Sequence, residues 1–203
     1  MSILSKNQFS KNWVPVVYAS YKNLENTKRH LSINCELRLI NSFSELDDSA
    51  INVLDVDALG ATITYGKKDK AIGRLAYHCL AQAVKDLNGG NIDVLVTAPI
   101  NKETVQSKHF SFIGHTDYLN ENIQGSSVMM MVSDSLRVAL LTEHLSLSKV
   151  TGFITKKLVD SRTKSIHKTL QLDFNIPEPK IAMLSIDPHA GDNGVIGNID
   201  NMV

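Results

Sequence analysis

The chain has 203 residues, 43% hydrophobic and 21% charged, so it can bury a core and has the composition of an ordinary globular protein. Its 21 basic and 21 acidic residues cancel, which argues against nucleic acid or an anionic membrane surface as a partner. The apolar runs are too short to cross a bilayer and no signal peptide is recognisable, so we expect a cytoplasmic protein without a membrane segment.

In chain order, the first half alternates short apolar strands with helices. Strands are predicted at 14–18, 36–40, 51–55 and 92–97, a first helix at 21–31, and a polar loop from 59 to 70. The strongest helix prediction is 69–87, where apolar residues recur on one face and Gly89 and Gly90 follow as a stop. A helix, a tight turn and a buried strand in this order indicate an α/β fold with a parallel sheet.

The second half has the same style. Strands are predicted near 127–132, 136–141 and 180–185, and helices near 116–124 and 148–171. The final residues, 198–203, have the pattern of an element that begins there. Neither a Gly-x-Gly-x-x-Gly segment after a strand nor a Walker-type loop occurs, so the sequence contains no standard nucleotide-binding fingerprint. Cys35 and Cys79 lack metal or redox spacing, and we expect Cys79 to be a buried thiol.

Two histidines stand directly after predicted strands. His189 lies in the glycine-containing run 187–197 after strand 180–185, and His144 follows strand 136–141. Open α/β sheets bind ligands at the carboxyl ends of their parallel strands, so the two imidazoles could share one divalent metal. The alternative is that each histidine only forms hydrogen bonds within its own loop.

Carboxylates near these histidines extend the metal hypothesis. Glu143, together with Asp187 or Asp192, could complete a metal site or orient the imidazole rings from behind. A metal-dependent hydrolase would need a general base beside the metal, and Glu143 is the one candidate.

A second group of candidates follows predicted strand 92–97. Lys102 lies in the loop after that strand, and His115 and Thr116 stand at a predicted helix start. A lysine charge, a hydroxyl donor and free backbone N–H groups suit an anionic substrate. The alternative is that Thr116 or Asp117 merely caps the helix and His115 is a surface residue.

Four segments in the same order, 99–102, 111–118, 142–147 and 187–194, resemble the 4-hydroxythreonine-4-phosphate dehydrogenase family. The resemblance implies NAD-dependent oxidation of a phosphorylated hydroxy amino acid in the biosynthesis of pyridoxal 5′-phosphate. It also implies an α/β/α sandwich of the isocitrate and isopropylmalate dehydrogenase type, here incomplete, with lobes at 1–98 and 99–203. A divalent metal (zinc, magnesium or cobalt) and a homodimer belong to the same expectation.

Residue by residue, the resemblance makes His115 and Thr116 the substrate-binding pair and His144 and His189 two of three metal-binding histidines. Lys102 is assigned a catalytic role near the substrate. In the family the third histidine lies further along than Val203, and a Gly-Asp-x-x-Gly-Ile-Gly segment precedes the part that this sequence matches. With two histidines the metal would be held poorly, so we expect little or no dehydrogenase activity from the 203 residues.

Several alternatives remain open at this point. Related enzymes acting on threonate or erythronate 4-phosphate would share the same motifs. A non-catalytic chain that binds a phosphorylated ligand is a second possibility. Asp192 stands where the family commonly has glutamate, and Asn198 and Ile199 replace an acidic pair. The sequence does not distinguish NAD from NADP, and it identifies no cofactor-binding residue.

Overall fold

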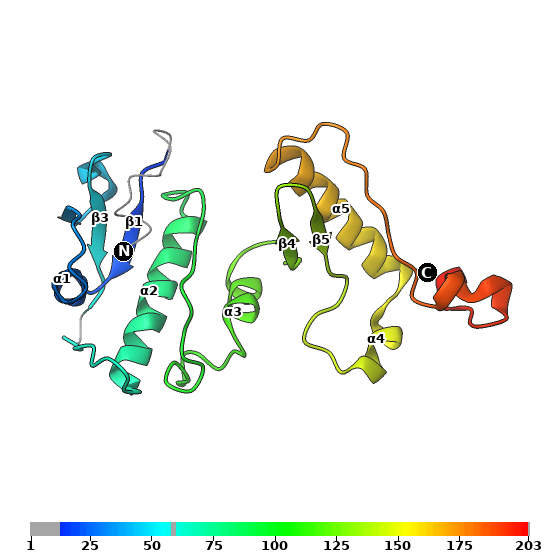
Figure 1. Cartoon of the computed structure of the whole chain (residues 1–203), viewed down its shortest axis with the longest axis horizontal. Helices are drawn as coiled ribbons and strands as arrows, with labels where there is room; N and C mark the ends of the chain where they lie inside the picture. Colours follow the sequence, from blue (N-terminus) through cyan, green and yellow to red (C-terminus); the bar gives the residue numbers. More distant parts are fainter. Residues whose placement is uncertain (1–12, 58–59, 203) are drawn as a thin grey trace. The chain divides into compact units, whose positions relative to one another are not determined.

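The computed structural model describes residues 13–57 and 60–202. The chain divides into two compact units, Met1–Gly125 and Ser126–Val203, which are described separately below (Figure 1). Among the residues described, no helix combines the length and the apolar character needed to span a bilayer.

The first unit contains a parallel three-stranded sheet with strand order β1-β3-β2. Its elements are β1 (Val16–Ala19), α1 (Tyr21–His30), β2 (Leu37–Ile40), the short 3-10 helix η2 (Phe43–Glu45), β3 (Ile51–Asp55), α2 (Lys70–Asn88) and α3 (His115–Asn122). The central strand carries Val53, which pairs with Val17 on one side and Leu39 on the other and is fully buried. The predicted strands before residue 56 and the predicted helices of this unit are confirmed within two residues.

Local signals explain where these helices begin and end. The hydroxyl of Ser20 caps α1 by accepting a hydrogen bond from the backbone N–H of Asn23. Asp69 caps α2 in the same way, through a bond from the N–H of Ala71. The chain leaves α2 at Gly90, whose φ of 71° is a left-handed conformation that glycine adopts without strain.

A second core of the first unit is built on α2. Leu80 and Val84 of α2 pack against Val105, Phe110 and Tyr118. Because the segment after α2 and helix α3 pack on α2, the first compact unit extends to Gly125. We expected the boundary between lobes at 98/99, and the division of the whole fold into lobes remains a prediction.

The prediction of a buried strand at 92–97 is wrong. The segment is irregular, and its side chains Val94 and Val96 are 72% and 83% exposed. A strand requires a neighbouring strand for its backbone hydrogen bonds, and no residue in the described ranges pairs with this segment.

The second unit is built around a hairpin and a long helix. Its elements are β4 (Met130–Val132), β5 (Arg137–Ala139), α4 (Leu147–Phe153), α5 (Lys156–Leu172), the short 3-10 element η3 (Pro188–Gly194) and α6 (Ile199–Met202). The expected single helix at 148–171 is two helices, because Thr155 interrupts it and caps α5 through the N–H of Leu158.

Two further predictions for this unit are corrected. Strands β4 and β5 pair antiparallel, because the N–H of Ser133 bonds the carbonyl of Leu136 at 2.9 Å and closes a tight turn between them. Segment 180–185 forms no strand, and Leu184 within it is 91% exposed. The loops that carry His144 and His189 therefore do not leave the ends of parallel strands.

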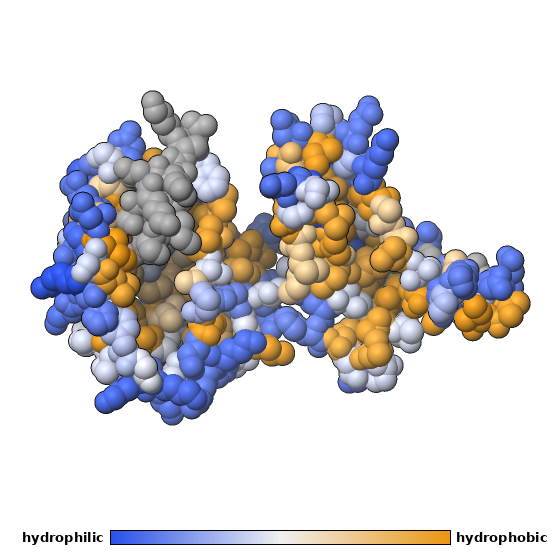
Figure 2. Space-filling model, viewed as in Figure 1, coloured by the Kyte–Doolittle hydropathy of each residue, from blue (hydrophilic) through white to orange (hydrophobic). Residues whose placement is uncertain are grey.

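Apolar side chains are widely exposed in the second unit, as Figure 2 shows on the face turned to the viewer. Leu147 and Val195 are 86% and 82% exposed, and its buried hydrophobic residues within the described ranges are Ile166 and Leu170 of α5. The core of this unit is therefore small, whereas the first unit buries two clusters of its own.

Replacing Phe110 by alanine tests the importance of the core on α2. Because this ring is fully buried, we expect the variant to lose about 3–5 kcal/mol of unfolding free energy in urea. The control is Phe153→Ala, at a ring that is 54% exposed, where we expect a change of about 0.5 kcal/mol or less. Equal losses in the two variants would contradict this assignment of the core.

Candidate functional site

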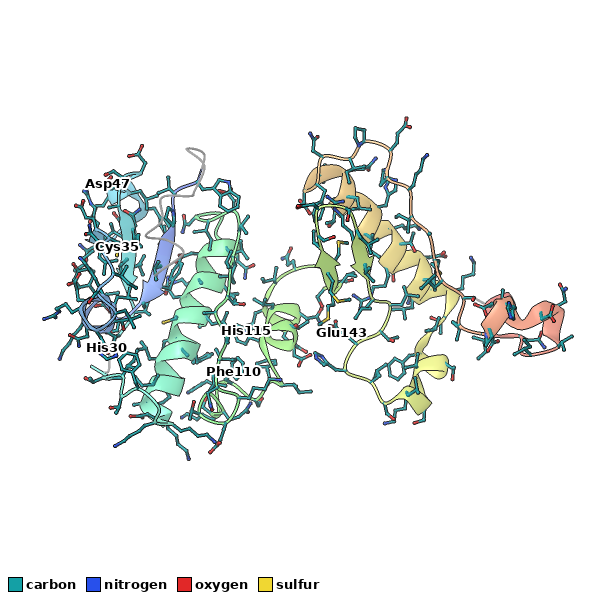
Figure 3. All side chains as sticks on the ribbon, in the orientation of Figure 1. His30, Cys35, Asp47, Phe110, His115 and Glu143 are labelled. Atoms are coloured by element: carbon teal, nitrogen blue, oxygen red, sulfur yellow. The ribbon has the colours of Figure 1, made fainter. Side chains whose placement is uncertain are left out.

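Helix α3, which carries His115 and Thr116, is held on α2 by a cluster of aromatic rings. The ring centroids of Phe110 and Tyr118 lie 5.4 Å apart, and Tyr77 of α2 meets Tyr118 edge-on at 6.1 Å. Phe112 contacts both Phe110 and Tyr118 at 5.3–5.5 Å. Such pairs add specific geometry to apolar burial, so they fix the orientation of α3 (Figure 3 labels Phe110 and His115).

The first turn of α3 is open. Gly114 occupies the capping position and no side chain caps the helix, so the expectation that Thr116 or Asp117 would do so is wrong. Backbone N–H groups at a helix start that lack a side-chain acceptor are available to an anion. Asp117 has a buried carboxylate oxygen, Oδ2, without a hydrogen-bond partner. This turn therefore combines donors for an anion with one unsatisfied acceptor.

His115 is half-buried at the start of α3, and this burial lowers the pKa of its imidazole below the ordinary 6.5. Burial disfavours the charged ring, so His115 is neutral at neutral pH and acts as a hydrogen-bonding group. His115 therefore offers no positive charge to an anionic ligand at neutral pH.

Lys102 is a candidate for that charge. It lies in the turn 101–105, is exposed, and forms no ion pair with any residue in the described part of the chain. Val105, at the end of the turn, belongs to the same buried cluster as Phe110 and Tyr118. The Lys102 turn and the start of α3 are thus anchored to one core.

The two predicted metal-binding histidines lie in irregular loops of the second unit. His144 follows β5 and His189 lies in η3; both are exposed, and each has a φ of 53°. Over the described ranges, no three histidine, cysteine, aspartate or glutamate side chains come together to hold a metal ion. These residues alone therefore do not form a metal centre, and the joint binding of one metal by His144 and His189 remains a prediction.

Two aspartates close the loop that carries His189. The carboxylate of Asp200 accepts hydrogen bonds from the N–H groups of Ile186 and Asp187 at 2.8 and 2.9 Å. In return, Asp187 accepts one from the N–H of Ile199 at 3.2 Å. Asp187 thus has a structural role, whereas Asp192 is exposed. The sequence offered no signal for Asp200, because its partners lie 13 and 14 residues away.

Among the carboxylates predicted to lie near His144 and His189, Glu143 has an oxygen atom without a hydrogen-bond partner. Its Oε2 atom is buried and has no hydrogen-bond partner, and the residue precedes His144 directly. Glu143 is therefore the one carboxylate proposed beside the metal histidines that has a buried acceptor still free. Cys79 is a half-buried free thiol, and burial raises its pKa to about 11, so the thiol is protonated at neutral pH.

A cavity of about 680 Å³ lies at the carboxyl ends of β2 and β3, beside α2, and its lining contains none of the predicted site residues. The buried Asp86 of α2 lines it and accepts hydrogen bonds from the Tyr18 hydroxyl (2.9 Å) and the Gln82 amide (3.0 Å). Burial and this carboxylate raise the pKa of Tyr18. The sequence analysis did not predict this hydrogen-bond network. Its one signal in the sequence was Asp86, a carboxylate among the apolar residues of α2.

The sequence model of a protein family, described as pyridoxal phosphate biosynthetic protein PdxA, matches residues 11–203 of this chain. The chain belongs to the PdxA family. It is 36% identical, over 90% of its length, to 4-hydroxythreonine-4-phosphate dehydrogenases of Bacteroides thetaiotaomicron and of a Sulfurihydrogenibium species. It covers 51% and 56% of those two proteins, and so spans about half the length of the curated relatives it matches.

Solved structures of PdxA-type enzymes agree with this assignment. The crystal structure of 4-hydroxythreonine-4-phosphate dehydrogenase from Klebsiella pneumoniae superimposes with a TM-score of 0.81 at 25% identity, covering 100% of this chain and 63% of that one. The expected family resemblance and the mixed α/β fold are therefore confirmed. A further relative, at 32% identity over 91% of this chain and 56% of its own length, is provisionally named D-threonate 4-phosphate dehydrogenase, from Oceanobacillus iheyensis.

A titration of His115 tests the electrostatics of the site. Its pKa in the folded protein should lie below 6.5, as measured from the ring protons by NMR. Because the unfolded chain then binds the proton more readily, unfolding free energy should fall as pH drops below 6.5 towards the folded pKa. A His115→Gln variant should lose this part of the pH dependence. A folded pKa at or above 6.5 would contradict the prediction.

Proposed function

We propose that the chain contributes to NAD-dependent and divalent-metal-dependent oxidation, with decarboxylation, of 4-phosphooxy-threonine in pyridoxal 5′-phosphate biosynthesis. NAD⁺, when bound, would accept a hydride from the carbon that bears the hydroxyl group, and the hydroxyl would lose its proton, so the alcohol would become a ketone. The resulting β-keto acid would release CO₂, and a proton from solvent would take the place of the carboxylate on the carbon. Membership of the PdxA family and the names of the relatives support the oxidoreductase assignment.

The observation that carries the proposal is the uncapped start of α3. Its free N–H groups and the Thr116 hydroxyl are donors for a phosphorylated ligand, and the neutral His115 imidazole adds a hydrogen bond without a charge. Lys102 supplies the positive charge. These three side chains form the proposed substrate site, with Lys102 as the residue proposed to act in catalysis.

The proposed metal dependence rests on two histidines of the second unit. His144 and His189 are the proposed ligands, but no third donor in the described part of the chain joins them. At least one further donor is needed for the proposed metal site, and NAD or NADP as hydride acceptor is likewise inferred from the dehydrogenase names. The homodimer and the isocitrate dehydrogenase-like sandwich remain proposals of the same kind.

One relative supports D-threonate 4-phosphate as an alternative substrate. D-threonate 4-phosphate differs from 4-phosphooxy-threonine in that it carries a hydroxyl group in place of the ammonium group. The relatives named 4-hydroxythreonine-4-phosphate dehydrogenase favour the ligand with the ammonium group as the first candidate.

Ligand binding tests the proposed substrate site directly. We expect the chain to bind 4-phosphooxy-threonine more tightly than D-threonate 4-phosphate in calorimetry, and His115→Ala to weaken that binding about tenfold through loss of one hydrogen bond. His167→Ala, at an exposed histidine of α5, is the matched control and should bind normally. Unchanged binding in His115→Ala would remove this residue from the site. Tighter binding of the threonate compound would favour the alternative substrate.

Catalysis by the 203 residues should be weak or absent. Because the described side chains do not assemble three metal donors, we expect little NADH from the purified chain supplied with 4-phosphooxy-threonine, NAD⁺ and Zn²⁺, Co²⁺ or Mg²⁺. The absorbance of NADH is the measurement. Robust NADH formation that a chelator abolishes would contradict this expectation and would support the metal-dependent reaction itself.

A further inference from the structure

We propose that Gly73 is a positioning residue, which places Lys102 by allowing the turn 101–105 to lie directly on helix α2. Gly73 is buried within α2, where glycine is the poorest helix former after proline. A Cβ atom at this position would overlap the carbonyl group of Thr104 and lie 2.8 Å from the backbone nitrogen of Val105. The absence of a side chain is therefore what permits the backbone contact.

The turn that rests on Gly73 is itself tightly bonded. The side-chain oxygen of Asn101 accepts hydrogen bonds from the N–H groups of Glu103 (3.1 Å) and Thr104 (3.0 Å). The N–H of Val105 donates to the Asn101 carbonyl at 3.1 Å. Thr104 and Val105 are 8% and 1% exposed. Lys102 thus extends from a closed turn that is anchored at its carboxyl end, so displacement of the turn displaces the lysine.

The charges around the turn leave Lys102 available to a ligand. Glu103, its neighbour, pairs with Lys68, and this ammonium group lowers the pKa of the Glu103 carboxyl. Lys102 has no such partner in the described part of the chain. The ammonium group is therefore free to meet an anion. That this anion is the phosphorylated substrate rests on the function proposed above.

A purely structural role for Gly73 would predict a different outcome. If the glycine only relieved crowding, Gly73→Ala would lower the stability of the chain. The molecules that still fold would then bind the ligand with wild-type affinity. If Gly73 acts through Lys102, the affinity loss in Gly73→Ala must disappear when Lys102 is already absent, because interacting positions are not additive.

The test is a double-mutant cycle on Gly73→Ala, Lys102→Ala and the double variant, with 4-phosphooxy-threonine affinity measured by calorimetry on the folded chain. We expect each single variant to bind about tenfold more weakly, from loss of one charged contact, and the double variant no more weakly than Lys102→Ala. The control is Gly152→Ala, because Gly152 lies in helix α4 and an added Cβ there meets nothing within 4 Å. Its affinity should be unchanged.

Hydrogen exchange provides a readout that does not depend on the ligand. The amides of Glu103 and Thr104 should exchange faster in Gly73→Ala than in the wild type, and at the wild-type rate in Gly152→Ala. Unchanged exchange of these amides in a folded Gly73→Ala would overturn the proposal. If the wild type binds no ligand, the proposed function fails, whereas the exchange result still decides whether Gly73 places the turn.

Asn101→Ala covers the case in which Gly73→Ala does not fold. It removes the two bonds that Asn101 accepts from the turn without introducing a steric overlap. We expect an affinity loss that is again absent when Lys102 is alanine. Wild-type affinity in Asn101→Ala would overturn the proposal, because the placement of Lys102 would then not depend on the turn.

Discussion

Close packing against one face of α2 is the constraint on which the candidate substrate site depends. Gly73 admits the backbone of the turn 101–105, and Tyr77, one helical turn further on, contacts the aromatic cluster that holds α3. Leu80 and Val84 continue this face into the same buried core. A single helix thus positions the segments that carry Lys102 and His115, and it does so through core contacts that are costly to disturb.

Sequence reasoning succeeded where the determining contacts are local. The apolar repeat of α2 and its glycine stop lie within one stretch of chain, and both were readable. The strands at 92–97 and 180–185 were misjudged because an apolar run becomes a strand only with a partner, and partners are distant in sequence. The hairpin β4–β5 had a readable signal in its short polar turn, which was missed.

The candidate site shows the same limit. Lys102, His115, His144 and His189 were identifiable as residue types in a recognisable order. Their surroundings were not, because the closing bonds of Asp200 and the backbone contact at Gly73 join segments separated by 13 to about 30 residues. The left-handed backbone at His144 and His189 was equally unforeseeable, since residues other than glycine adopt this conformation uncommonly.

The two units differ in construction, and this difference separates the proposed binding of substrate from the proposed oxidation in physical terms. The first unit holds the proposed substrate groups on a buried core, so their geometry is determined within that unit. The second unit holds the proposed metal histidines in loops, around a core whose buried apolar residues in the described ranges are Ile166 and Leu170. Metal chemistry demands a fixed geometry of at least three donors, whereas anion binding needs only a few placed donors and a charge. The proposed recognition of a phosphorylated ligand therefore has fewer structural requirements than the proposed oxidation.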